Sequence, residues 1–310
     1  MTVPARVYRR RRLVALGVLL AIVGGVALLL GTGGDGTGDR TSRASADPPP
    51  RQLPRGGRSL LPEQRVVAFY GAPQSRELGT LGIGTPDEAA GRLARQAAPY
   101  ERRRRPVLPA LELITVIAAA HPGDDDTYRT RQSAAVIRRY LRAARRARGL
   151  LILDIQPGRS DFFRETIRLE RWLKEPDVGL ALDPEWRIGP DEVPGQVIGR
   201  VDSREVNATS AWLDQLVARE RLPEKLFVIH QFTDGMVDET ALKPREHLAI
   251  VLNTDGFGDR PNKRVKYHDF TRESPGFHQG FKLFYEEDVD LMRPRDVMRL
   301  RPAPDFVVYE

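Results

Sequence analysis

The sequence predicts an α/β protein whose folded part is a (β/α)8 barrel. Eight short apolar runs lie between residues 66 and 309, and segments with helical patterns separate them. Most of the runs are apolar on both faces, which is typical of parallel strands covered by helices. A barrel of this type has about 250 residues, and 245 residues follow residue 65. The pattern and the length therefore both favour a TIM barrel.

The eight expected strands are Val66–Tyr70, Leu108–Ala118, Leu150–Ile155, Val178–Leu182, Lys225–Phe232, Leu248–Asn253, Phe281–Tyr285 and Phe306–Tyr309. An open doubly wound sheet is the alternative. Such a sheet usually has a glycine-rich phosphate-binding turn after its first strand. The glycines at this place, Gly79, Gly82 and Gly84, do not have the required spacing.

Helix signals lie between the expected strands. Residues 85–88, Thr-Pro-Asp-Glu, combine a capping residue, a first-turn proline and acids near the positive end of a helix dipole. Residues 136–144 form an apolar stripe with helical spacing that Gly149 ends. Further helices are expected to begin at Ser160-Asp161 and at Ser203. The segments after Phe232, Asn253 and Tyr285 have weaker patterns and are expected to be loops with short helices.

The N-terminal part predicts a membrane anchor. Residues 1–12 are a basic tail, and residues 13–30 are 18 residues without a polar side chain. As a helix, such a run is about 27 Å long, close to the thickness of a bilayer core. The arginines place the tail in the cytoplasm and the rest outside the cell membrane. A cleaved signal peptide is the alternative, but its A-x-A-like site, residues 44–46, lies well beyond the apolar run.

Residues 31–58 are rich in Gly, Thr, Ser, Asp, Pro and Arg, which predicts a disordered linker before an extracytoplasmic barrel domain, residues 59–310.

The net charge of +7 belongs to the N-terminal part, because residues 1–65 contain 11 Arg and 4 acids and the remainder contains 38 residues of each sign. A balanced folded domain argues against nucleic acid as a partner. The chain has no cysteine, which excludes disulfides and a cysteine nucleophile.

The carboxyl ends of the strands of a barrel meet at one mouth, where the functional site lies. Asp183 and Glu185 follow the fourth expected strand, and residues two apart on a strand face the same side, roughly 6.5–7 Å apart. Neighbouring carboxylates raise the proton affinity of one of them, as acid–base catalysis requires. We expect Glu185 to be the acid/base and Asp183 its partner, with Asp154 and Asp255 as candidates for nucleophile or base.

Other residues at the strand ends are expected to bind the substrate, and no metal or other cofactor is expected. The candidates are Tyr70, Gln156, Trp186, His230, Gln231, Tyr285 and Glu287. The tyrosines and Trp186 offer flat apolar faces on which sugar rings stack. The same strand ends also include Glu112, Asn253 and Glu310.

The D-x-E of Asp183 and Glu185 resembles the end of the motif on the fourth strand of chitinase-like TIM-barrel glycoside hydrolases. The two aspartates that precede it in that family are Val178 and Ala181 here. The whole chain also looks like actinobacterial membrane-anchored surface proteins with a barrel domain. The resemblance implies a glycoside hydrolase-like protein that acts on, or binds, an envelope or environmental glycan.

Two other functions remain open. The first is a non-catalytic surface barrel that binds a glycan or a partner. The second is a metal-dependent deacetylase, because residues 120–126, AHPGDDD, resemble the A-H-P-D-D-E metal motif of zinc-dependent N-acetylglucosamine deacetylases. In that case His121 and the following aspartates would bind the metal.

Overall fold

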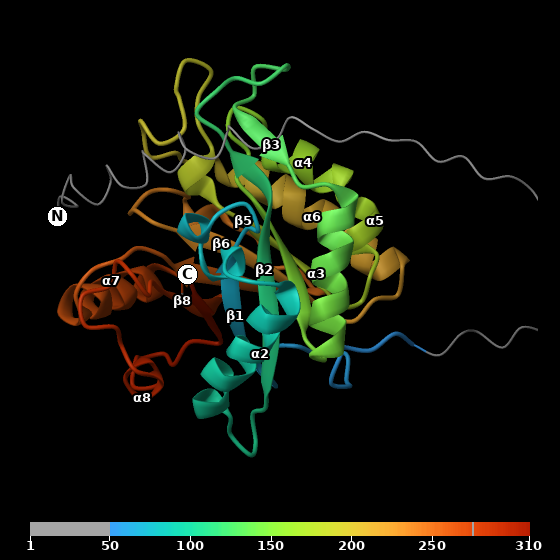
Figure 1. Cartoon of the computed structure of the whole chain (residues 1–310), viewed down its shortest axis with the longest axis vertical. Helices are drawn as coiled ribbons and strands as arrows, with labels where there is room; N and C mark the ends of the chain where they lie inside the picture. The colour runs from blue at the N-terminus through green and yellow to red at the C-terminus, as the bar shows by residue number, and fades with distance from the viewer. Residues whose placement is uncertain (1–49, 275) are drawn as a thin grey trace, which may run out of the picture.

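The computed structural model describes residues 50–274 and 276–310, in which eight parallel strands close into a barrel surrounded by helices (Figure 1). The closure is made by β1, which pairs with β2 on one side and with β9 on the other. The barrel strands are β1 (Arg65–Gly71), β2 (Val107–Ala118), β4 (Leu150–Ile155), β5 (Val178–Leu182), β6 (Lys225–Gln231), β7 (Leu248–Thr254), β8 (His278–Leu283) and β9 (Phe306–Tyr309). The predicted barrel is confirmed. One short strand that was not predicted, β3 (Arg129–Arg131), pairs antiparallel with the end of β2.

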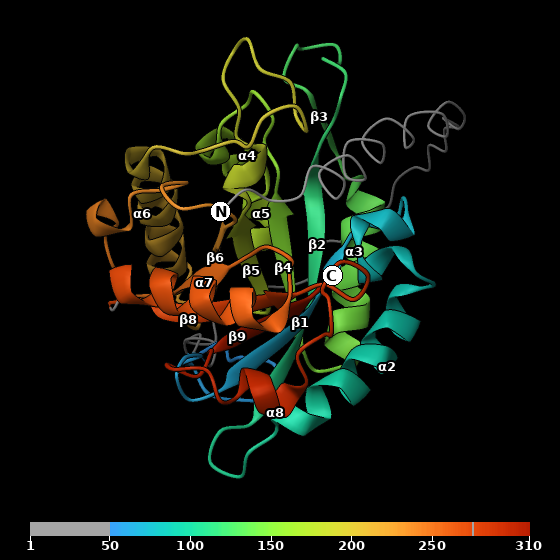
Figure 2. The ribbon, with the colours of Figure 1, turned by 90° about the vertical axis from the view of Figure 1, so that its left-hand side faces the viewer.

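The helices lie outside the strands (Figure 2). They are α2 (Pro86–Ala97), α3 (Ala134–Arg146), α4 (Phe162–Arg168), α5 (Glu170–Leu173), α6 (Ser203–Arg219), α7 (Arg260–Glu273) and α8 (Pro294–Val297). Single 3-10 turns are η2 (Arg76–Leu78), η3 (Thr80–Gly82), η4 (Ala98–Tyr100), η5 (Pro184–Trp186) and η6 (Glu239–Ala241). Thr85 caps α2 as predicted, and it also forms a capping box with Glu88. Asp202, and not Ser203, caps α6.

The prediction of a loop with short helices after β7 was wrong, because α7 is 14 residues long. Its sequence has few apolar residues, and one of them, Val265, is exposed. The apolar stripe that marks most surface helices is therefore weak here. Asp259 caps the helix by accepting from the backbone N–H of Asn262 at 2.9 Å. This polar cap fixes the residue at which the helix begins.

Two apolar layers stabilise the barrel. The outer layer packs strands against helices, and the inner layer fills the closed barrel with side chains such as Leu108, Ile152, Val228 and Phe306. Side chains alternate between the two faces along each strand. Toward the carboxyl ends of the strands, the inner positions change from apolar to polar, which places the charged side chains together at one end.

Residues 50–64 close the opposite end of the barrel. Leu53, Leu60 and Leu61 are buried there, and Arg58 donates to the backbone oxygen of Leu222 at 2.7 Å. Residues 50–58, which the composition assigns to the linker, thus pack against the domain. The arginines of this segment donate five hydrogen bonds to backbone oxygens of the rest of the domain, and Leu53 is buried. A Gly- and Pro-rich composition does not reveal these contacts.

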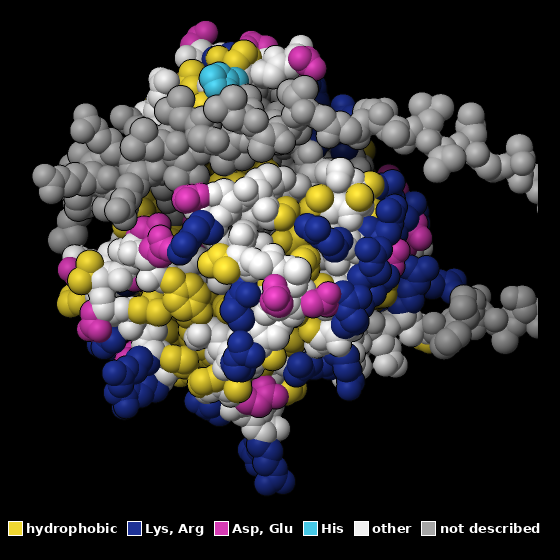
Figure 3. Space-filling model, in the orientation of Figure 1, with side chains coloured by type: hydrophobic (Ala, Val, Ile, Leu, Met, Phe, Trp, Pro, Cys, Tyr) yellow, Lys and Arg dark blue, Asp and Glu magenta, His cyan; other side chains and the backbone are white. Residues whose placement is uncertain are grey.

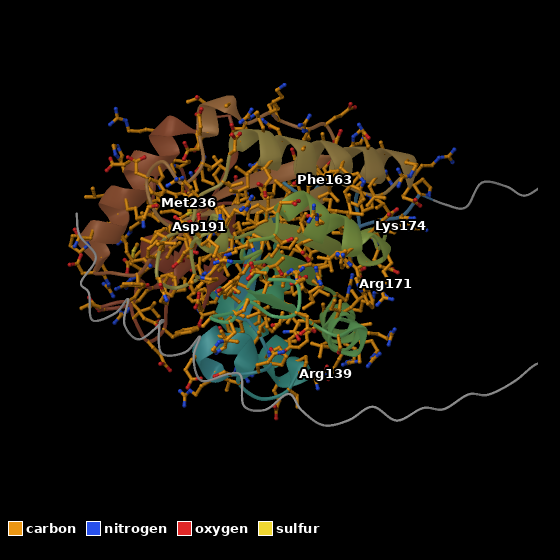
Figure 4. All side chains as sticks on the ribbon, turned by 90° about the horizontal axis from the view of Figure 1, so that it is seen from above. Arg139, Phe163, Arg171, Lys174, Asp191 and Met236 are labelled. Atoms are coloured by element: carbon orange, nitrogen blue, oxygen red, sulfur yellow. The ribbon has the colours of Figure 1, made fainter. Side chains whose placement is uncertain are left out.

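Exposed cations lie on the outside of the barrel, most densely on the side formed by α3 (Figure 3). Arg139, Arg171 and Lys174 lie at the periphery of the molecule (Figure 4). Acids lie beside several of these cations, as in the 2.6 Å pair of Arg146 and Asp87.

Among the described residues, no helix has the length and apolarity needed to cross a bilayer. The predicted tail, anchor and residues 31–49 of the linker lie outside the described residues.

Lys225, at the beginning of β6, is buried on the outer face of the barrel. Its ammonium group donates to the backbone oxygen of Glu175 at 3.0 Å. Burial lowers the pKa of Lys225 to about 7, since a low-dielectric environment disfavours the charged form.

We expect Lys225→Met to change how stability depends on pH. Between about pH 7 and the ordinary pKa of 10.5, the native chain has lost the Lys225 proton and the unfolded chain keeps it. The free energy of unfolding of the wild type therefore increases as the pH rises. Lys225 contributes up to about 1.4 kcal/mol of this increase per pH unit. Urea unfolding at pH 7, 8 and 9 should show a steeper rise in wild type and in the control Lys243→Met than in Lys225→Met, in which the buried Lys266 still contributes. Parallel curves for all three proteins would contradict the assignment.

Candidate functional site

Charged and polar side chains from all eight barrel strands, or from residues directly after them, lie buried at the carboxyl end of the barrel. They are Tyr70, Glu112, Asp154, Asp183, His230, Asn253, Asp255, Lys282 and Glu310, and all but Glu310 are nearly inaccessible to solvent. Burying charge is costly unless partners compensate it. A concentration of such groups in one place marks a candidate functional site.

Tyr70 lies between two carboxylates. Its hydroxyl is 3.2 Å from Oδ2 of Asp154 and 3.4 Å from Oδ2 of Asp183, and it accepts from the side-chain amide of Gln156 at 3.0 Å. Burial, and then the neighbouring charge of Asp183, raise the pKa of Asp154 well above its usual range. Burial likewise raises the pKa of Tyr70. The tyrosine is therefore a neutral hydrogen-bond donor between two carboxylates of different strands.

His230 lies between two other carboxylates. Its Nδ1 is 3.0 Å from Oδ2 of Asp255, and its Nε2 is 3.1 Å from Oε1 of Glu112. Asn253 also approaches Nδ1, at 3.1 Å. Burial alone would lower the pKa of His230, but Glu112 and Asp255 together hold the pKa well above its ordinary value. The imidazole thus connects β2, β6 and the end of β7.

Lys282 connects these groups to the far side of the barrel. Its ammonium nitrogen is 3.0 Å from Oδ2 of Asp255 and 2.8 Å from Oε2 of Glu310. It also lies 3.9 Å from the centre of the Tyr70 ring, close enough for a cation–π interaction. Lys282 is not among the residues predicted from the sequence. The alternation Gly280, Lys282, Phe284 within an apolar run could have indicated an inward-facing lysine.

A small pocket opens above these side chains, with a volume of about 60 Å³. It is lined by Tyr70, Glu77, Leu78, Ile114, Ile117, Ala118, Gln156, Asp183, Trp186, Lys282 and Glu310. A carboxylate and an indole, Asp183 and Trp186, therefore face the same space. A larger groove of about 650 Å³ lies elsewhere, between α2 and α3. Two charged residues in its lining, Asp87 and Arg146, form an ion pair with each other.

The structure brings together six of the residues singled out from the sequence: Tyr70, Asp154, Gln156, Asp183, His230 and Asp255. Trp186 joins them at the pocket. Glu185 is buried nearby but does not share a strand face with Asp183. The strand β5 ends at Leu182, and Pro184 begins the 3-10 turn η5, so the expected spacing of alternate strand residues does not apply.

Three other candidates lie away from the pocket lining. Gln231 follows His230 directly, so its side chain takes the outer face, where it donates to Glu239. Tyr285 is exposed, stacks on Tyr309 with ring centres 5.3 Å apart, and donates to Gln96 at 2.9 Å. Glu287 is half-buried in the loop after β8.

The acid-rich loop of residues 120–126 is a surface loop between β2 and β3. His121 is exposed, Asp125 pairs with Arg129 at 2.8 Å, and Asp126 pairs with Arg159 at 3.1 Å. Within the described part of the chain, the group of three side chains close enough to share a metal ion is Glu112, Asp154 and His230. The loop therefore does not provide the ligand cluster that the deacetylase alternative requires.

The fold and the site define the chain as a parallel eight-stranded α/β barrel protein with a buried charged site at the carboxyl ends of its strands. No protein-family model matches the sequence, and no curated protein is significantly similar to it. The resemblance to glycoside hydrolases thus rests on the barrel and on one motif spacing.

We expect Lys282→Met to lower the free energy of unfolding by about 3–5 kcal/mol, because it removes the cation from a buried cluster of carboxylates. The double variant Lys282→Met/Glu310→Gln should lose less than the two single variants together, since it also removes one uncompensated charge. Urea unfolding measures both effects.

The control is Lys174→Met, which alters an exposed lysine paired with Glu170 at 3.1 Å. Its stability should remain close to that of wild type, since exposed pairs contribute little. If Lys282→Met were equally stable, the ammonium group would not be the cation that balances these acids.

Proposed function

We propose that the chain is a glycoside hydrolase-like protein that binds a glycan at the barrel mouth and cleaves it by carboxylate chemistry. The observation that supports this proposal is the position of Asp183, which lines the pocket beside Trp186 and lies near Asp154 across the Tyr70 hydroxyl. Two carboxylates in such proximity, one of them open to a pocket, are what acid/base cleavage of a glycosidic bond requires.

Asp183 is the better candidate for the group that touches the substrate. Glu185, which the sequence favoured, is not part of the pocket lining, whereas Asp183 is. In this proposal Asp183 gives a proton to the glycosidic oxygen as the bond between that oxygen and the anomeric carbon breaks. Water then adds to the anomeric carbon, and the proton that it releases restores Asp183. Asp154 remains behind Tyr70 as the second carboxylate and orients the tyrosine through its hydrogen bond.

Trp186, Gln156 and Glu310 would bind the sugar. A pocket of about 60 Å³ accepts one edge of a sugar ring with its hydroxyl groups, and the indole of Trp186 offers the flat apolar face on which the ring stacks. The amide of Gln156 and the carboxylate of Glu310 supply hydrogen-bonding groups for the hydroxyls. The predicted anchor would hold this mouth outside the cell membrane, so an envelope glycan is the substrate class we infer.

We expect Asp183→Asn to reduce the rate of glycan cleavage by about 100-fold or more, the usual size of a general acid/base contribution. The full-length protein, purified in a mild detergent, would be tested against a panel of envelope and environmental polysaccharides. Release of reducing ends measures cleavage. Asp87→Asn is the matched control, because it makes the same change in a carboxylate that pairs with Arg146 on the outer surface.

Thermal unfolding would verify that Asp183→Asn is folded. Cleavage that persists in this variant would exclude Asp183 from the mechanism. Binding of a polysaccharide without cleavage, weakened by Trp186→Ala, would instead identify the non-catalytic barrel that the sequence left open.

A further inference from the structure

The deepest charged residues of the barrel form a compact cluster below the pocket. Glu112, Asp154 and His230 are each 0% exposed. One potential ligand atom from each residue lies within 4.8 Å of the other two. The Nε2 atom of His230 is 3.1 Å from Oε1 of Glu112 and 4.0 Å from Oδ1 of Asp154. Ligand atoms that are each about 2.1 Å from one ion are separated by about 3–4 Å.

Two oxygens of this cluster have no hydrogen-bond donor among the described residues. They are Oε2 of Glu112 and Oδ1 of Asp154, and both are inaccessible to solvent. A buried carboxylate oxygen without a donor is costly, because it has lost its hydrogen bonds to water and has formed none within the protein. Both orphaned oxygens belong to the same cluster, so one positive ion placed between the two carboxylates would compensate both.

The surroundings of His230 suit a metal ligand. A proton on Nδ1 can donate to Oδ2 of Asp255, which lies 3.0 Å away. A metal ion bound at Nε2 would replace the proton that this nitrogen otherwise holds toward Glu112, and the Nε2 lone pair would then face Glu112 and Asp154. A carboxylate that holds one imidazole nitrogen while the other binds metal is the common second-shell arrangement of metal sites. Turning the Asn253 amide by half a rotation would place its orphaned Oδ1 near the same proton.

The charge balance points the same way. Among the described residues, the buried cluster contains five carboxylates, Glu112, Asp154, Asp183, Asp255 and Glu310, against the side chains of Lys282 and His230. A divalent cation would offset this excess, and it would favour ionised carboxylates and a neutral imidazole as its ligands.

We propose that Glu112, Asp154 and His230 bind one divalent transition-metal ion. An imidazole nitrogen with two carboxylate oxygens suits Zn²⁺ or Mn²⁺, because imidazole favours the first and carboxylates the second. The ion would fix Asp154, and through the hydrogen bond of Asp154 to Tyr70 it would position the carboxylates at the pocket. The proposal does not depend on the proposed glycan cleavage.

The test uses the full-length protein after treatment with a chelator. Zn²⁺ or Mn²⁺ is then added separately, the bound ion is counted by mass spectrometry, and thermal unfolding is followed. We expect about one ion per chain and a higher unfolding midpoint, since an ion that binds only the native state stabilises it. His230→Gln and Glu112→Gln should lose stoichiometric binding. His121→Gln, the same change in the exposed loop histidine, should retain it.

If the two cluster variants do not fold, X-ray absorption at the metal edge of the wild-type protein decides the question. One imidazole among oxygen ligands would support the site, and a spectrum without imidazole would overturn it. Folded, chelator-treated wild type that binds neither ion would also overturn the proposal, as would equal binding by folded His230→Gln. None of these measurements depends on glycan cleavage, so the two proposals succeed or fail separately.

Discussion

The need to compensate charges inside a closed barrel is the constraint on which this site depends. The barrel strands leave no free edge between them, and the inner layer is filled by apolar side chains. A charged inner residue must therefore find its partners on other strands. Lys282 does so by contacting Asp255, Glu310 and the ring of Tyr70. The side chains at the mouth are consequently held by one another as well as by the backbone.

This network has two levels that Tyr70 and Asp154 join. One oxygen of Asp154 faces the Tyr70 hydroxyl, and through it Asp183 and the pocket. The other oxygen faces His230 at 4.0 Å, in the cluster below. A change in the lower cluster would therefore reach the pocket through Asp154 and Tyr70, and also through Asp255 and Lys282. The hydrolytic proposal concerns the upper level and the metal proposal the lower, which is why each has its own measurement.

The sequence allowed the barrel to be predicted because most of its strands are apolar runs between turn or helix signals. It also predicted that polar residues ending these runs would meet, and Asp154, His230 and Asp255 do. The directions of side chains were predicted wrongly at places where the chain no longer has the geometry of a strand. Pro184 starts a 3-10 turn, which removed Glu185 from the expected face. Lys282 was missed because β8 begins at His278, three residues before the expected strand, so the alternation was read from the wrong start.

The large polar side chains fit inside the barrel because small residues lie beside them. In the strand register, Asp154 pairs with Ala181 and Asn253 pairs with Gly280. A Cβ atom on Gly280 would lie 2.5 Å from Oδ1 of Asn253, so only glycine leaves room for that amide next to His230. Barrel interiors are filled by layers of side chains, and here small residues on some strands offset long polar ones on others. The site is therefore specified as much by Ala181 and Gly280 as by the charged residues themselves, since a bulkier inner layer would exclude the network that makes burial of these charges tolerable.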